Sequence, residues 1–134
     1  MSSDQYHEPP EELSQEIRTF ARLSASLKEE AEAIGWYEQR ISLEHDPQAK
    51  AIMENAQQEE FKHFAMALEF LSRRKPKWQA VLKEVLFKKG DIVEHGEEGE
   101  KAEEKVSDVK RRAGPRTRRS PHTRPQSGQD PRGH

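Results

Sequence analysis

Two interleaved series of positions recur every seven residues between Leu13 and Leu43. The first series is Phe20, Leu27, Ile34 and Ile41, and the second, three residues on from its first three members, is Leu23, Glu30 and Tyr37. This spacing is typical of a helix that buries one apolar stripe against a partner. We therefore predict a first long helix over residues 13–43, with one carboxylate among its buried positions.

Residues 46–75 carry the signals of a second helix. Asp46 followed by Pro47 is a strong start, because aspartate caps the first turn and proline suits its first position. The helix must end near Pro76, since a proline disfavours helical backbone in the residue before it. Its buried stripe reads Ala49, Met53, Ala56, Glu60, His63, Ala67 and Phe70. A short connection between the helices predicts an antiparallel hairpin.

A third, shorter helix is predicted from Pro76 until Gly90. Its apolar positions follow helical spacing: Trp78, Val81, Leu82, Val85 and Leu86. No strand pattern and no glycine-rich phosphate loop occurs in the sequence. The fold class is therefore predicted as all-α, with residues 1–12 as an N-terminal extension and residues 13–96 as the helical domain.

The C-terminal part differs in charge and composition. Residues 1–96 carry 13 basic and 18 acidic side chains (−5), whereas residues 97–134 carry 10 and 7 (+3). From Ser107 onward only Val109 and Ala113 are aliphatic, too little apolar surface to offset the entropy of ordering. We expect residues 97–134 to be a disordered charged tail.

Composition narrows the function classes. The 134 residues are 31% hydrophobic and 36% charged, a thin supply of core that suggests a partner chain. The absence of cysteine excludes a disulfide framework, a thiolate zinc site and a thiol nucleophile. No apolar run approaches the roughly 18 residues that span a bilayer, so we expect a soluble, cytoplasmic protein without a membrane partner.

Ionisable residues occupy the predicted buried stripes at one level. Glu30 lies 15 residues before His45 at the turn and Glu60 lies 15 residues after it, with His63 one helical turn beyond. A single glutamate in such a stripe can reflect a misassigned register or a side chain that reaches solvent. Three ionisable groups at one level instead indicate a metal, because burying unpaired charge costs several kcal/mol.

Glutamate oxygens and an imidazole nitrogen without thiolate favour iron or manganese over zinc. In di-iron bundles two helices each give a Glu and two others each give Glu-x-x-His. This chain has one of each, so a complete di-iron site needs two chains, each contributing Glu30, Glu60 and His63. Two helices are likewise half of a four-helix bundle, which predicts a homodimer.

Other residues are candidates for supporting roles. A second face of the first helix, formed by Glu29, Glu32 and Trp36, is either solvated or an outer site that gathers calcium or other hydrated divalent cations. Tyr37, two turns from Glu30, either reaches the metal site or is a core tyrosine. The remaining histidines have no partner at ligand spacing and are interpreted as surface residues: His7, His45, His95, His122 and His134.

The sequence also allows two functions other than catalysis. A helical oligomer with these ligands can bind divalent metal without catalysis. Residues 110–134 hold eight Arg or Lys against one Asp, as in a nucleic-acid-binding arm. Because this arm lacks aromatic residues for base stacking, nucleic acid is not the expected partner.

The chain closely resembles the encapsulated ferritins over residues 7–93. The resemblance lies in HEP (7–9), EEAEAIGWYEQR (29–40), DP (46–47), EEFKHFAMALEFLSRR (59–74) and LF (86–87). It implies two antiparallel helices that dimerise into a ferritin-like four-helix bundle, with dimers assembled into a decameric ring.

For individual residues, the resemblance implies a ferroxidase that oxidises Fe(II) at a centre between subunits. Glu30, Glu60 and His63 would bind iron and Tyr37 would lie beside the centre. Glu29, Glu32 and Trp36 would form the metal-uptake site. The oxidised iron would be delivered into an encapsulin nanocompartment, which makes the shell protein a partner. Family members commonly finish in a short Leu/Gly/Ile-rich docking peptide, whereas this chain finishes HTRPQSGQDPRGH.

Overall fold

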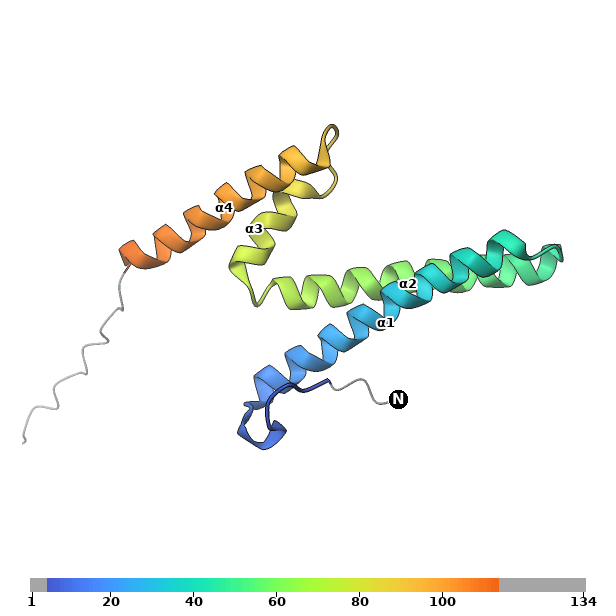
Figure 1. The fold of residues 1–134 in the computed structure, drawn as a ribbon, viewed down its shortest axis with the longest axis horizontal. Coiled ribbons are helices and arrows are strands. Elements are labelled where there is room, and N and C mark those ends of the chain that lie inside the picture. The colour runs from blue at the N-terminus through green and yellow to red at the C-terminus, as the bar shows by residue number, and fades with distance from the viewer. Residues whose placement is uncertain (1–4, 114–134) are drawn as a thin grey trace, which may run out of the picture.

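A computed structural model describes residues 5–113 of the chain. Its elements are a 3-10 helix, η1 (Pro10–Glu12), followed by α1 (Gln15–Leu43), α2 (Pro47–Ser72), α3 (Pro76–Val85) and α4 (Ile92–Ala113). The described part contains no strand, which confirms the predicted all-α class. Helices α1 and α2 form a long antiparallel hairpin, and α3 leads away from its end to α4 (Figure 1).

Local signals set the ends of the hairpin helices. The Ser14 hydroxyl accepts a hydrogen bond from the Ile17 amide at 3.2 Å, which caps α1. The Asp46 carboxylate accepts from the Ala49 amide at 2.8 Å, and Pro47 occupies the first position of α2. Both caps satisfy amide groups that the first turn of a helix leaves without partners. The predicted cap at Asp46 is confirmed.

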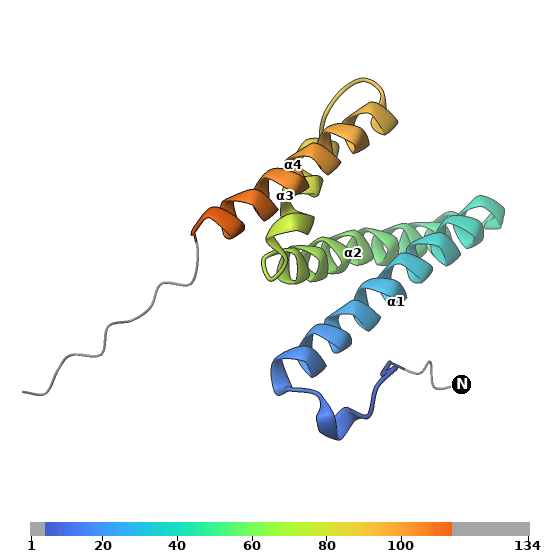
Figure 2. The same cartoon turned by 60° about the vertical axis from the view of Figure 1, so that its left-hand side comes forward.

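Helices α3 and α4 form a second hairpin, in which α3 packs against α4 (Figure 2). Asp91 caps α4 by accepting hydrogen bonds from the next amides, at 2.8 Å from Val93 and 3.0 Å from Glu94. Gly99 is buried at the crossing, where a Cβ would stand 3.2 Å from the Val81 side chain. The absence of a side chain therefore lets the two backbones approach closely.

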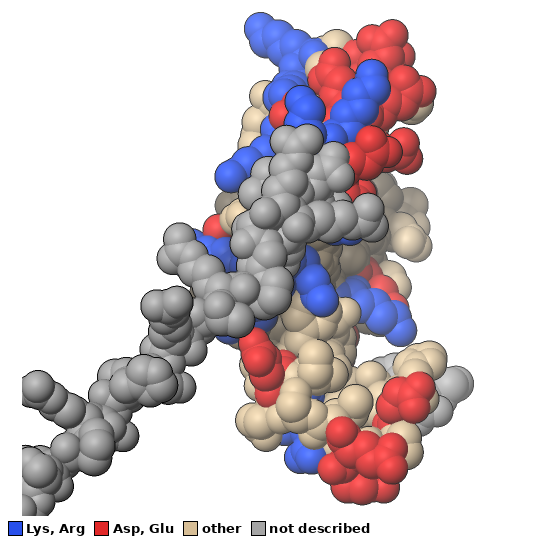
Figure 3. Space-filling view, turned by 90° about the vertical axis from the view of Figure 1, so that its left-hand side faces the viewer, with Lys and Arg blue, Asp and Glu red and all other residues tan. Residues whose placement is uncertain are grey.

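The predicted disordered tail is wrong for residues 97–113, which belong to α4. This stretch is rich in Glu, Lys and Ala, which favour helix, and it starts beside a capped turn and packs on α3. Low hydrophobicity did not prevent this helix, because its partner α3 supplies apolar surface. Basic and acidic side chains are interspersed at the α3–α4 end, and acidic ones gather over η1 (Figure 3). Residues 114–134 lie outside the described part.

Little of the chain is buried. Among residues 5–106, whose burial the structure describes, the buried apolar side chains are Ala67 and Leu71, near the end of α2. The predicted stripes of α1 and α2 face each other but remain half-buried at Phe20, Leu23 and Ile34. No helix among the described residues is long and apolar enough to span a membrane.

Candidate metal centre

Glu30 on α1 meets Glu60 and His63 on α2, and we call these three residues the candidate cluster. One ligand atom from each lies within 4.8 Å of the others. His63 Nδ1 is 3.5 Å from Glu60 Oε2 and 3.8 Å from Glu30 Oε2. The predicted equal level of the three side chains is confirmed. The short connection produces it, because equal numbers of residues on either side of the turn face each other.

In the described part of the chain, the candidate cluster leaves one buried polar atom unsatisfied. Glu60 Oε2 is buried and has no hydrogen-bond partner within the described residues. The Glu30 and Glu60 side chains are 23% and 22% exposed, whereas His63 is 46% exposed. A partly buried carboxylate without a partner is costly, and a bound cation would satisfy it. Two carboxylates and one imidazole are a donor set that suits Fe(II) or Mn(II).

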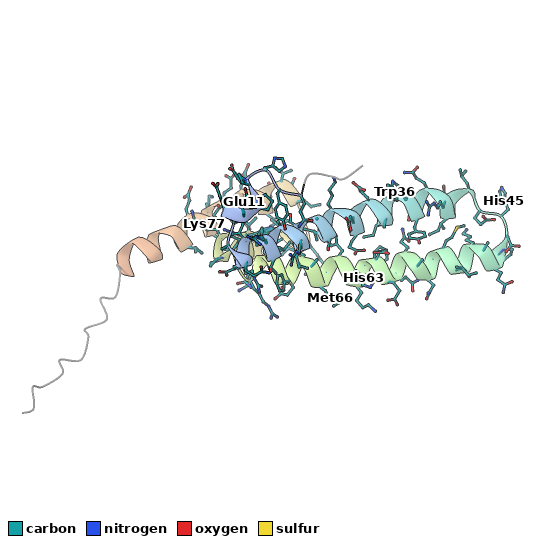
Figure 4. All side chains as sticks on the ribbon, turned by 90° about the horizontal axis from the view of Figure 1, so that it is seen from below. Glu11, Trp36, His45, His63, Met66 and Lys77 are labelled. Carbon is teal, nitrogen blue, oxygen red and sulfur yellow. The ribbon has the colours of Figure 1, made fainter. Side chains whose placement is uncertain are left out.

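The cluster opens onto an apolar surface. A concavity of about 460 Å³ runs from Glu30 and His63 past Leu23 and Met66. Met66 lies three residues after His63 on α2, and it is 63% exposed (Figure 4). The ligand atoms therefore sit at the edge of an uncovered apolar face of the hairpin.

Tyr37 is half-buried on α1, two turns from Glu30. The guanidinium of Arg40 lies over its ring at 5.5 Å from the centroid. At this distance the guanidinium is attracted to the face of the ring. The structure thus places Tyr37 on the predicted stripe but outside the candidate cluster.

The predicted outer site lies on the exposed side of α1. Glu29 and Glu32 are both exposed, and Trp36, on the side of α1 away from α2, is 54% exposed (Figure 4). Lys28 lies 3.9 Å from Glu32, so one of the two carboxylates already has a cationic neighbour. The structure brings none of the three residues into the candidate cluster, in agreement with their separate face.

One histidine interpreted as a surface residue is engaged. Only 19% of the His95 side chain is exposed, its Nδ1 lies 3.3 Å from Glu98 Oε2, and its Nε2 lies 2.7 Å from the Lys89 carbonyl oxygen. These two acceptors raise the pKa of His95. His95 and Glu98 are three residues apart, so they share one face of a helix. The sequence could have indicated this pair only if a helix had been expected beyond Gly90.

Sequence reasoning also missed Gln57, whose side chain links the two helices beside the candidate cluster. Its amide nitrogen donates hydrogen bonds to the Ile34 carbonyl at 3.2 Å and to Glu38 Oε2 at 2.8 Å. The available signal was its position three residues before Glu60, on the side of α2 that turns toward α1.

Comparison with known proteins identifies the chain's relatives. The EncFtn-like family model matches residues 5–89, more than half of the sequence. The chain belongs to the EncFtn-like family. This confirms the resemblance to encapsulated ferritins, and the assignment indicates an iron-related, ferritin-like function.

Individual relatives agree with the EncFtn-like assignment. The chain is 45% identical to a "Ferritin-like protein" of Thermotoga maritima over 96 residues, 72% of this chain and 84% of the relative. It is 42% identical to an "Encapsulated ferritin-like protein" of Rhodospirillum rubrum over 91 residues, 68% of this chain and 65% of that protein. A crystal structure of a Nitrosomonas europaea protein superimposes with a TM-score of 0.63 at 41% identity, covering 65% of this chain and 96% of that one.

Proposed function

We propose that the protein is a ferroxidase whose di-iron centre forms between two copies of the chain. The observation that carries this proposal is the candidate cluster itself. Two carboxylates and an imidazole from facing helices converge within 4.8 Å, and one buried carboxylate oxygen lacks a partner. Fe(II) is the substrate that this donor set and the EncFtn-like assignment together favour.

Two features support a second chain at the site. The hairpin buries almost no apolar side chains of its own, and its exposed Met66 borders the ligand atoms. A helical hairpin with so small a core needs a partner for stability. Two chains would also supply four carboxylates, which balance the +4 charge of two Fe(II) ions. The bundle would then contain four helices, and the ring of dimers is proposed by resemblance alone.

In the proposed reaction, two Fe(II) ions lose one electron each. Dioxygen accepts these two electrons and two protons to give hydrogen peroxide, or peroxide accepts them with two protons to give two waters. Glu30 and Glu60 favour this change because additional negative charge stabilises Fe(III) more than Fe(II). One His63 from each chain would supply a nitrogen ligand to each ion.

Tyr37 and the outer site receive supporting roles in this proposal. Tyr37 lies on the same stripe as Glu30. Its hydroxyl would lie beside the centre, where it would reach a metal ligand across the dimer interface. Glu29 and Glu32 would attract hydrated Fe(II), calcium or other divalent cations before transfer inward, and Trp36 would narrow the route.

The oxidised iron is proposed to pass into an encapsulin shell for storage. The support is the EncFtn-like assignment and the description of the Rhodospirillum rubrum relative as encapsulated. This proposal would place the protein inside a cytoplasmic nanocompartment.

Anaerobic loading with Fe(II), followed by exposure to air, tests the activity. The parent protein should show rapid Fe(III) absorbance, and Glu30→Ala, Glu60→Ala and His63→Ala should each lose it while remaining helical. Native mass spectrometry with and without Fe(II) should show a dimer or a multiple of it with two irons per dimer. Stoichiometric binding without faster oxidation than in buffer would favour the alternative, a non-catalytic metal-binding oligomer.

A further inference from the structure

Gln57 on α2 makes two hydrogen bonds to α1. Its Nε2 donates to the backbone carbonyl of Ile34 at 3.2 Å and to the carboxylate of Glu38 at 2.8 Å. A carbonyl and an ionised carboxylate only accept hydrogen bonds, so the amide nitrogen must be the atom that faces α1. The two N–H groups of one carboxamide therefore match two acceptors on successive turns of the opposite helix.

These hydrogen bonds lie one turn from the candidate cluster. Gln57 precedes Glu60 by three residues, and Ile34 follows Glu30 by four residues. In an antiparallel hairpin both steps lead toward the connection between the helices, by about 5.4 Å per turn. Gln57 thus joins α1 to α2 at the level next to the metal ligands.

The short connection brings Glu30 level with Glu60 and His63 to within about one helical turn, and a directional contact is needed to hold the alignment more closely than that. The buried apolar side chains, Ala67 and Leu71, lie on the far side of the cluster from Gln57. Half-buried apolar stripes tolerate sliding, because their attraction depends little on direction. A slide of one turn moves Glu30 by about 5.4 Å, which exceeds the 4.8 Å span of the ligand atoms.

We propose that Gln57 is a positioning residue, which holds α1 and α2 in the register that lets Glu30 share a metal ion with Glu60 and His63. This inference rests on the proposed function of the candidate cluster as a metal centre. The two hydrogen bonds of Gln57 go to Ile34 and Glu38, neither of which belongs to the candidate cluster, so Gln57 acts on the ligands through the position of α1. The hydrogen bond to the ionised carboxylate is the stronger of the two.

Anaerobic Co(II) titration of the full chain tests the inference without requiring iron oxidation. Visible absorption reports the coordination geometry of Co(II), and calorimetry gives its affinity. Gln57→Leu keeps similar volume and removes the donor, so it should weaken Co(II) binding about 5- to 30-fold and change the absorption band. Gln58→Leu makes the same change at the adjacent exposed position and should leave both unchanged.

Two further variants separate positioning from folding. Circular dichroism should show parent helix content for Gln57→Leu. If that variant does not fold, Gln57→Glu takes its place, because it keeps the shape and polarity but faces Glu38 with like charge. Exchanging donor and acceptor in the double variant, Gln57→Glu with Glu38→Gln, should restore part of the Co(II) affinity lost in the single variant.

The outcomes distinguish the inference from the function on which it rests. Parent-like Co(II) affinity and absorption in Gln57→Leu, with binding lost in Glu60→Ala, would refute the positioning role and leave the metal centre intact. Parent-like Co(II) binding in both Glu60→Ala and His63→Ala would refute the metal centre itself. Loss of affinity in Gln57→Leu with partial recovery in the exchanged pair would support the inference.

Discussion

Replacing Glu60 with leucine should stabilise the metal-free protein and abolish its stabilisation by metal. Among residues 5–113 the buried Glu60 Oε2 finds no hydrogen-bond partner, and a Glu30 carboxylate oxygen lies within 4.8 Å of a Glu60 oxygen. The metal-free centre is therefore destabilising, and Glu60→Leu removes both the unpaired oxygen and the repulsion.

The magnitude follows from two contributions. Leaving a buried acceptor unsatisfied costs about 1–3 kcal/mol. Two like charges 4.8 Å apart repel by about 3.5 kcal/mol at an effective dielectric constant near 20, and by less at sites that keep some solvent contact. Because the carboxylates are about one-fifth exposed, we expect the free energy of unfolding to rise by about 1–3 kcal/mol in Glu60→Leu.

Urea unfolding in the presence of a chelator, at pH 8 and equal protein concentration, measures this change. The matched control is Glu59→Leu at the neighbouring exposed position. Glu59 pairs with Lys62 at 2.7 Å, which holds the pKa of Glu59 below its usual value. Exposed pairs of this kind contribute little, so Glu59→Leu should change the free energy of unfolding much less than Glu60→Leu does.

Metal should reverse the order of stability. At a free Co(II) concentration 1,000 times its dissociation constant, the parent gains about 4.1 kcal/mol, whereas Glu60→Leu should gain almost nothing. Lower metal-free stability in Glu60→Leu than in the parent would refute the reasoning that Glu60 is held in an unfavourable site. If Glu59→Leu and Glu60→Leu raised the free energy of unfolding equally, the general loss of negative charge would explain the gain, and the surroundings of Glu60 would not.

Three further predictions concern other parts of the chain. Alanine at each outer-site position, Glu29, Glu32 or Trp36, should change the rate of Fe(II) oxidation in stopped-flow experiments. It should leave the iron occupancy of the candidate cluster unchanged, because these side chains lie on another face of α1. Gly96→Ala should stabilise α4 by up to about 1 kcal/mol in thermal unfolding, since its Cβ meets open space. Gly99→Ala should raise the melting temperature less than Gly96→Ala does, because its Cβ would stand 3.2 Å from the Val81 side chain. Equal shifts in melting temperature would contradict the close helix crossing. Because the pKa of His95 is raised in the folded state, its imidazolium stabilises the α3–α4 turn below the ordinary pKa near 6.5, and this contribution should vanish as the pH rises through the folded value. The positive charge of Lys88 lowers this pKa and so opposes the effect of Glu98. If the stability of the parent and that of His95→Gln changed with pH in the same way, the contribution of His95 would be excluded.

The sequence by itself determined the hairpin and the members of the candidate cluster. Asp46 and Pro47 begin α2 through contacts within one helical turn, so their effect does not depend on the rest of the fold. The connection is so short that equal counts from it bring Glu30 level with Glu60, as the ligand distances confirm. Local capping and helical periodicity are sufficient to predict the hairpin, and the level of the ligands to within about one helical turn.

Tertiary structure alone decided the contacts between elements. A charged stretch rich in helix-forming residues has similar composition whether it is disordered or packed, so α4 became recognisable only through its contact with α3, where Gly99 meets Val81. The bonds from Gln57 likewise depend on which way one side chain turns between two helices. Such contacts depend on distances between residues remote in sequence, which periodicity does not specify, because it describes each helix separately.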